Sequence, residues 1–174
     1  MKEASTVNPA SQYVEASRDR SPIHRYVADN GVGVAKQNVE HVIVAGQEVA
    51  LSTDLTAEER AFVEEAIQIT PASAKICFAN ALRMWVYNDR FAYAEGFAAM
   101  TDIDFNGIEH AWCMLDGEKL VDVTAAFDAY HGAIISDPDV LERYTGAALT
   151  NNGIIGNRRD RYEFLQERGY TDYR

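Results

Sequence analysis

The spacing of apolar residues predicts two helices in the first half of the chain. Apolar side chains recur at helical spacing over 57–69, which is typical of an amphipathic helix that buries one face. Thr56 and Glu59 stand at the two positions of a capping box at the start of this segment. Ser73 fits the N-cap of a second helix over 74–88, which is apolar around most of its circumference.

Alternation of apolar and polar residues then predicts strands. Runs of period two occupy 90–100 and 108–124, and an Asp-Gly pair divides the second run into the two arms of a tight hairpin. A β-rich run with a glycine after it predicts a further hairpin over 41–51, and a short strand is expected over 131–136. The stretch 24–46 as a whole is expected to be extended or irregular.

The segments outside these elements complete the fold class. Residues 1–20 are polar and mixed in charge, so we expect a flexible or irregular arm, followed by a single domain over 21–174. Asp137 or Ser136 caps a predicted helix with a proline at an early position, and a last helix over 157–168 is closed by Gly169. The order of elements predicts an α+β domain with helices packed on an antiparallel sheet.

The composition narrows the range of partners and cofactors. Apolar residues make up 47% of the 174 residues, which is enough for a core without disulfide bonds. The formal net charge of −11 repels phosphate backbones, so nucleic acid is not an expected partner. No apolar run is long enough to span a membrane and no secretory leader is apparent, so we expect a cytoplasmic protein without a membrane partner. Two cysteines and four scattered histidines show no metal-ligand spacing, so no metal or other cofactor is expected, and no pattern indicates an oligomeric state.

The position of Cys77 at the front of the predicted helix over 74–88 suggests a chemical role. The first N–H groups of a helix have no partner within it, and the positive end of the helix dipole lies beside them. Both features favour a thiolate over a thiol, and the thiolate is the nucleophilic form. The same N–H groups are able to stabilise the oxyanion that forms when a carbonyl is attacked. The alternative is that Cys77 is a buried cysteine of the core, which is common for this residue type.

A base for this thiol is found by the parity of the predicted hairpin. His110 and Trp112 point to one face of their strand, whereas Cys113 points to the other. Cys113 is therefore expected to be a core residue. A one-residue shift of the hairpin register places Asp122 diagonally beside His110 on the same face. There the carboxylate accepts from one ring nitrogen and leaves the other free for a thiol, as in a catalytic triad. Taken singly, His110 and Asp122 fit structural roles as well.

These segments resemble a known group of enzymes. The sequences CFANA, YAEGFA and EHAWCMLDGEKLVDVT are similar to the transglutaminase-like group of the papain-like cysteine hydrolase superfamily. The resemblance covers about residues 73 to 125. It implies a papain-like fold in which a nucleophile-bearing helix packs on an antiparallel sheet. It also implies that Cys77 is the nucleophile, His110 the base and Asp122 the orienting residue.

Three further residues are candidates for substrate binding or support of the triad. Glu95 lies on an apolar strand face, where a carboxylate is costly unless it is paired. It either contacts the substrate or the triad, or forms an ion pair with an arginine such as Arg83 or Arg90. Asn80 lies one turn after the cysteine, and either lines the site or bonds to the sheet. Trp112 is either a wall that excludes water from the site or an ordinary core residue.

The sequence therefore predicts a cysteine-dependent hydrolase or acyltransferase, such as a thiol protease or amidase. It would act on an amide or ester bond of a peptide or small acyl substrate through a thioester intermediate. An amine acyltransferase or cross-linking enzyme would use the same site with a different acceptor. A second class of function is a non-catalytic binding protein of the same fold that sequesters a small ligand or a protein partner.

Overall fold

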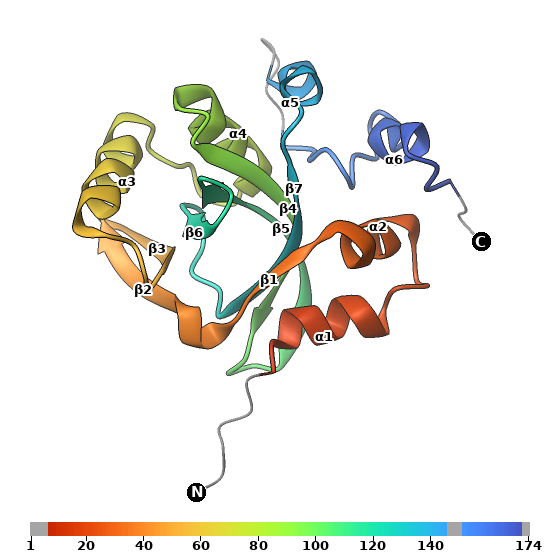
Figure 1. The fold of residues 1–174 in the computed structure, drawn as a ribbon, viewed down its shortest axis with the longest axis horizontal. Coiled ribbons are helices and arrows are strands. Elements are labelled where there is room, and N and C mark those ends of the chain that lie inside the picture. Colours follow the sequence, from red (N-terminus) through yellow and green to blue (C-terminus); the bar gives the residue numbers. More distant parts are fainter. Residues whose placement is uncertain (1–6, 146–150, 172–174) are drawn as a thin grey trace, which may run out of the picture.

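One antiparallel sheet organises the chain. In the computed structural model, which describes residues 7–145 and 151–171, seven strands pair in the order β1-β7-β4-β5-β6-β3-β2. Figure 1 shows that the sheet curls strongly, with helices arranged around it. The strands are β1 (Val32–Val34), β2 (Val39–Val44), β3 (Gln47–Ser52), β4 (Phe91–Met100), β5 (Phe105–Leu115), β6 (Lys119–Asp122) and β7 (Ala129–Ile135). The helices are α1 (Pro9–Ala16), α2 (Pro22–Asn30), α3 (Ala57–Ile69), α4 (Cys77–Tyr87), α5 (Pro138–Tyr144) and α6 (Glu163–Glu167), with a single 3₁₀ turn at Lys36–Asn38.

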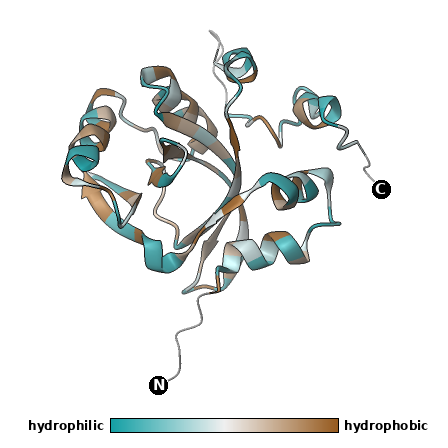
Figure 2. Cartoon of the chain, in the orientation of Figure 1, coloured by the Kyte–Doolittle hydropathy of each residue, from teal (hydrophilic) through white to brown (hydrophobic). Residues whose placement is uncertain are grey.

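The two faces of the sheet are buried in different ways. The larger core lies between the helices and one face, and it takes Tyr93 and Phe97 from β4 and Leu82 from α4. The opposite face forms a smaller core, to which Trp112 and Tyr130 contribute. None of the described helices adds a residue to this smaller cluster, because the curl of the sheet brings its own strands together. Figure 2 shows the hydrophilic colour mainly on the outer turns of the peripheral helices.

Several predicted elements are confirmed. The helix from Ala57 has the expected capping box between Thr56 and Glu59. The hairpin over 41–51 is formed by β2 and β3, whose turn residues Ala45 and Gly46 both have positive φ. Hairpin β5–β6 turns at the Asp-Gly pair, and the strands predicted over 90–100 and 131–136 are β4 and β7. Asp137 caps α5 as expected.

The prediction of an irregular arm over residues 1–20 is wrong for its described part. Pro9–Ala16 form helix α1, whose N-terminus is capped by the Asn8 side chain. Ala10 and Val14 are fully buried, so this helix belongs to the domain, and a boundary at residue 21 is not supported. The helix is difficult to predict from the sequence because it is short and its apolar residues are mostly alanine and valine among polar residues.

Three other boundaries differ from the predictions. Pro22–Asn30 form α2, capped by Ser21, where an extended segment was expected. Helix α4 begins at Cys77, after the N-cap Ile76, and not at residue 74. The last helix is limited to Glu163–Glu167, because Arg161 and Tyr162 both take left-handed backbone conformations. Gly169, with φ of +80°, follows this helix as predicted.

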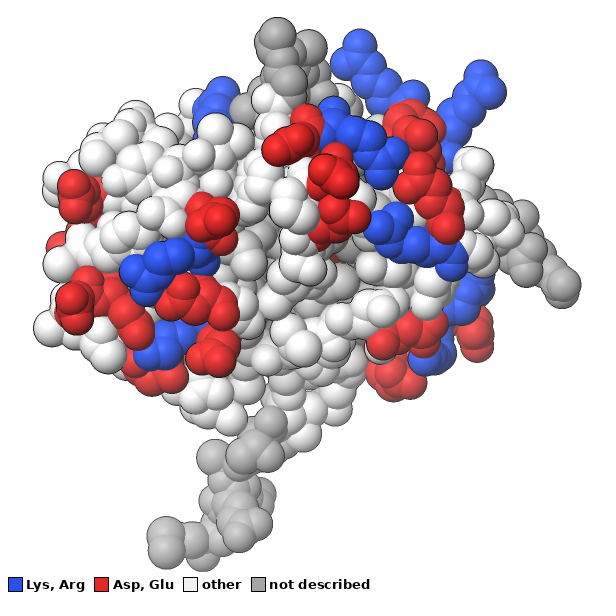
Figure 3. All heavy atoms as spheres, turned by 45° about the horizontal axis from the view of Figure 1, so that its top comes forward, with Lys and Arg blue, Asp and Glu red and all other residues white. Residues whose placement is uncertain are grey.

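The surface carries both signs of charge in close proximity. Figure 3 shows acidic and basic side chains side by side in groups on the face it displays. Ion pairs among the described residues include Arg60 with Glu40 and Arg90 with Asp116. Among the described helices, none has the length and apolar character that a membrane span requires.

The integration of α1 into the core gives a direct test. We expect Val14→Ala to lower the free energy of unfolding by about 1–2 kcal/mol, because it removes buried methyl groups. The matched control is Glu15→Ala in the next position, whose side chain is 73% exposed, and this change is expected to have little effect. Urea denaturation of both variants measures the difference. Equal stability of the two variants would mean that α1 does not pack as described.

Candidate active site

Helix α4 places the Cys77 sulfur at its N-terminus. Cys77 is the first residue of the helix and is partly exposed. The expected N-cap, Ser73, does not cap the helix: its backbone N–H donates to Oδ1 of Asn80, and its carbonyl accepts from Nδ2 of the same amide. Lys75 has a positive φ of 65°, so the chain turns sharply just before the cysteine. The predicted location of Cys77 in the first turn is correct, but the local cap is not the one expected.

The cap of this helix comes from a distant segment. Oδ1 of Asn151 accepts from the N–H groups of Phe78 at 3.0 Å and Ala79 at 3.4 Å. These are two of the helix N–H groups that lack an acceptor within the helix. The Cys77 N–H has no hydrogen-bond acceptor among the described residues. Asn151 therefore occupies two of the N–H groups that we expected to stabilise an oxyanion. Within the described residues, the Cys77 N–H remains available to donate to an oxyanion. No local pattern in the sequence marks Asn151 as this cap, because it lies 73 residues from Phe78.

His110 and Asp122 form a buried pair on the face that carries the smaller core. Nε2 of His110 lies 2.7 Å from Oδ2 of Asp122, and the two side chains are 4% and 0% exposed. The strands pair with Cys113 opposite Val121, so no shift of register is needed. His110 and Asp122 have the same parity in this register, and the pair forms diagonally across the strands.

The Asp122 carboxylate is held by donors from four other residues. Oδ1 accepts from the backbone N–H groups of Thr124 and Ala125, while Oδ2 accepts from the Tyr130 hydroxyl at 2.8 Å in addition to the His110 contact. These bonds offset the cost of burying the carboxylate. Tyr130 is fully buried, and parity of the β5–β6 hairpin gave no indication of it because it comes from β7.

The pair changes the electrostatics of the imidazole. Burial lowers the pKa of His110, but the charge and hydrogen bond of Asp122, together with the nearby Cys77, raise it from 6.5 to about 10. This direction favours the protonated form of the His110 imidazole. Because Nε2 faces Asp122, the other ring nitrogen remains for the Cys77 sulfur. An imidazolium beside a cysteine stabilises its thiolate.

Cys113 and Trp112 are both buried in the core of the protein. Cys113 is 1% exposed in the larger core, and its Sγ contacts the carbonyl oxygen of Ala81. Burial raises the pKa of this thiol, which keeps it in the unreactive form. Trp112 is 2% exposed and its ring lies 6.0 Å from that of His110 and 5.0 Å from that of Tyr130. Trp112 belongs to the smaller core beside His110, a position that fits both the wall and the core interpretation.

Asn80 connects the nucleophile helix with the segment that follows Asp122. Its Nδ2 donates to Oγ1 of Thr124 at 2.9 Å as well as to the Ser73 carbonyl. The side chain is 2% exposed, so it does not offer its amide to a ligand. Asn80 thus bonds to the sheet side of the site and holds the start of α4 beside β6.

Glu95 forms no ion pair with Arg83 or Arg90. Arg90 instead pairs with Asp116. The buried Glu95 carboxylate accepts from the Tyr93 hydroxyl at 2.5 Å and from the backbone N–H groups of Ile154 and Gly156 at 2.7 and 2.8 Å. Burial raises the pKa of Glu95, and these three donors oppose that effect. Glu95 therefore anchors the segment that also carries Asn151.

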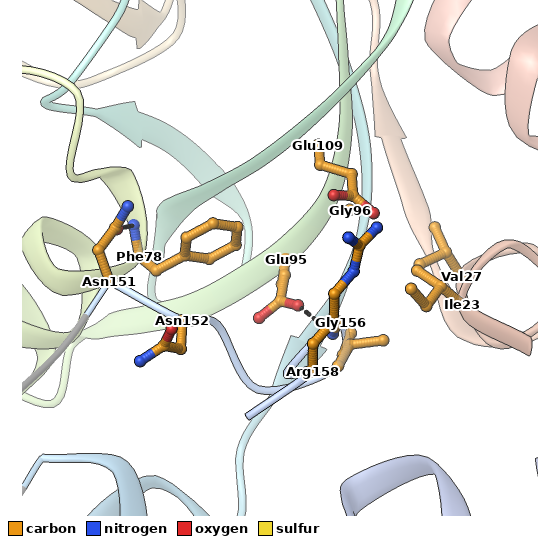
Figure 4. Close-up of a pocket in the computed structure, with 11 residues that line it drawn as sticks. Ile23, Val27, Phe78, Glu95, Gly96, Glu109, Asn151, Asn152, Gly156 and Arg158 are labelled. Carbon is orange, nitrogen blue, oxygen red and sulfur yellow. Dashed lines mark hydrogen bonds between the residues drawn. The ribbon is translucent and has the colours of Figure 1, made fainter. Parts of the chain in front are cut away.

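A cavity of about 210 Å³ lies beside the start of α4. Figure 4 shows Glu95 between Phe78 on one side and Gly156 and Arg158 on the other. Cys77, His110 and Asp122 do not line this cavity, but Phe78 and Glu109, their neighbours in the chain, do. The cavity therefore lies beside the helix that begins at Cys77, and none of the three predicted catalytic residues lines it.

The fold and the site define an α+β protein with a curled antiparallel sheet and a buried histidine–aspartate pair beside a helix-terminal cysteine. Comparison of the chain with family models, with curated proteins and with solved structures finds no match.

The distant cap gives a test of how the nucleophile helix is held. We expect Asn151→Ala to lower the free energy of unfolding by about 1 kcal/mol, because two helix N–H groups lose their acceptor. Asn151→Asp is expected to retain stability, since a carboxylate also accepts these bonds and interacts favourably with the helix dipole. Thermal unfolding of both variants measures this. A neutral effect of Asn151→Ala would contradict the capping role.

Proposed function

We propose that the protein is a cysteine-dependent hydrolase or acyltransferase that acts on amide or ester bonds. Cys77 is the nucleophile, His110 the general acid and base, and Asp122 the residue that orients and charges the imidazole. The observation that carries this proposal is the buried contact of 2.7 Å between His110 and Asp122, next to a cysteine at a helix N-terminus. This arrangement corresponds to a nucleophile, a base and an orienting group.

The proposed reaction follows from these positions. The Cys77 thiolate attacks the carbonyl carbon, a C–S bond forms, and the charge moves to the carbonyl oxygen near the open Cys77 N–H group. The His110 imidazolium donates its proton to the leaving nitrogen or oxygen, and the scissile bond breaks. The resulting thioester reacts with water or an amine that His110 deprotonates, which releases the product and restores the thiolate.

The acceptor decides whether the protein is a hydrolase or an acyltransferase. Both reactions share the first half, up to the thioester, and use the same three side chains. A binding protein of the same fold would have no need for a charged imidazole beside the sulfur, since ligand capture does not require a thiolate. We therefore favour the enzyme, and the papain-like arrangement of the transglutaminase-like group as its fold.

Reactivity of the cysteines at neutral pH tests this proposal. We expect iodoacetamide to modify Cys77 at least about tenfold faster than Cys113, and His110→Ala to slow the modification of Cys77 by about tenfold or more. In the Cys113→Ala background, incubation with p-nitrophenyl acetate should leave an acetyl group on Cys77, which intact-protein mass spectrometry detects. Slow labelling of both cysteines, unaffected by His110→Ala, would favour the binding protein.

A further inference from the structure

Two residues that line the cavity beside α4 are sequence neighbours of the proposed catalytic residues. Phe78 follows Cys77 on one wall, and Glu109 precedes His110 on another. Because Phe78 is the residue next to Cys77 at the start of α4, a substrate with its carbonyl at Cys77 would reach this space from the helix side. Glu109 and His110 are successive strand residues and point to opposite faces of the sheet. The apolar part of the cavity lining comes from Phe78, Ile155, Ile23 and Val27. Such a surface suits the hydrocarbon stem of a side chain.

The buried Glu95 carboxylate gives this space a chemical preference. An ionised carboxylate offers about four acceptor positions. Three of them are filled: Oε1 by the Tyr93 hydroxyl and the Ile154 N–H, and Oε2 by the Gly156 N–H. These donors favour the ionised form and oppose burial, which raises the pKa of Glu95. One position on Oε2 remains open for a donor from a ligand.

The charges at the mouth of the cavity add to this preference. Glu109 and Arg158 both line it, and within the described residues neither forms an ion pair or a side-chain hydrogen bond. Figure 4 shows their charged groups on the same side of the cavity. The two carboxylates outnumber the single guanidinium, and Glu95 is the buried one of the three, where water screens its charge least. The cavity as a whole thus favours a cation.

We propose that this cavity binds a substrate side chain that ends in an ammonium or guanidinium group, with Glu95 and Glu109 as its acceptors. The inference rests on the proposed acyl-transfer function. The hydrocarbon stem lies along Phe78 and Ile155, and the cationic end donates to Oε2 of Glu95. Arg158, which no described residue holds in an ion pair, opposes the bound cation and weakens the preference. Glu95 has two functions in this scheme, since it also anchors the segment that forms one wall.

Affinity labels that differ only in one side chain test the proposal. N-acetyl chloromethyl ketones of lysine, norleucine and glutamate alkylate an active-site cysteine and carry cationic, neutral and anionic side chains. We expect the lysine reagent to modify Cys77 about tenfold faster than the norleucine reagent, and the glutamate reagent to be slowest. Equal rates for lysine and norleucine would overturn the cationic preference.

Variants at the cavity locate the preference. Glu95→Gln should reduce the lysine-to-norleucine rate ratio to about one, and Glu109→Gln should reduce it by roughly threefold. Arg158→Gln should raise the ratio by a similar factor, because it removes a like charge. Glu109 and Arg158 are at the surface, so these two variants decide the question even where Glu95→Gln fails to fold. An unchanged or lowered ratio in Arg158→Gln would overturn the proposal.

Matched controls separate local from general charge effects. Glu118→Gln and Arg159→Gln remove an exposed acidic and an exposed basic side chain that do not line the cavity. Neither change should alter the ratio.

The iodoacetamide result separates failure of the two proposals. If iodoacetamide labels Cys77 selectively but the reagents show no charge preference, only the cationic preference fails. If Cys77 shows no selective reactivity towards iodoacetamide, the proposed function itself fails.

Discussion

The buried pair of His110 and Asp122 is the interaction on which the site depends. Isolated in the interior, the carboxylate would be protonated or would destabilise the fold. The protein avoids this with the backbone N–H groups after β6 and with the hydroxyl of Tyr130 from β7. The curl of the sheet brings β7 within reach of the end of β6, because the smaller core closes around Trp112 and Tyr130. The curvature of the sheet therefore helps to hold the Asp122 carboxylate that pairs with the His110 imidazole.

The proposed nucleophile and the buried pair come from opposite sides of the sheet. Helix α4 packs into the larger core, whereas His110 and Asp122 share a face with the smaller core. In the described chain, β5 pairs with β6 over Cys113–Leu115 alone, so its preceding part, with His110, has β4 on one side and no strand on the other. This opening beside β5 lets the start of α4 approach the imidazole, and the bond from Asn80 to Thr124 holds the helix there.

Local signals in the sequence were enough for much of the fold and for the positions of the three predicted catalytic residues. The Asp-Gly turn located the hairpin, although the one-residue shift of register expected for Asp122 does not occur, and parity separated His110 from Cys113. The sequence did not reveal contacts between distant segments. Asn151 caps α4 and Glu95 anchors residues 154 and 156 across separations of 59 to 73 residues, and no local pattern marks such partners. Helix α1 was missed for a related reason, since its stability comes from packing on the sheet more than from its own sequence.

The protonation state of His110 in the folded protein tests the central claim most directly. The nitrogen chemical shifts of a histidine ring distinguish an imidazolium from a neutral imidazole, and the His110→Gln variant assigns the signals. Burial lowers the pKa of this ring, but Asp122 and Cys77 raise it to about 10, so the account predicts an imidazolium at pH 7 and a titration that moves to lower pH in Asp122→Asn. A neutral His110 ring at pH 7 in the folded protein would contradict it.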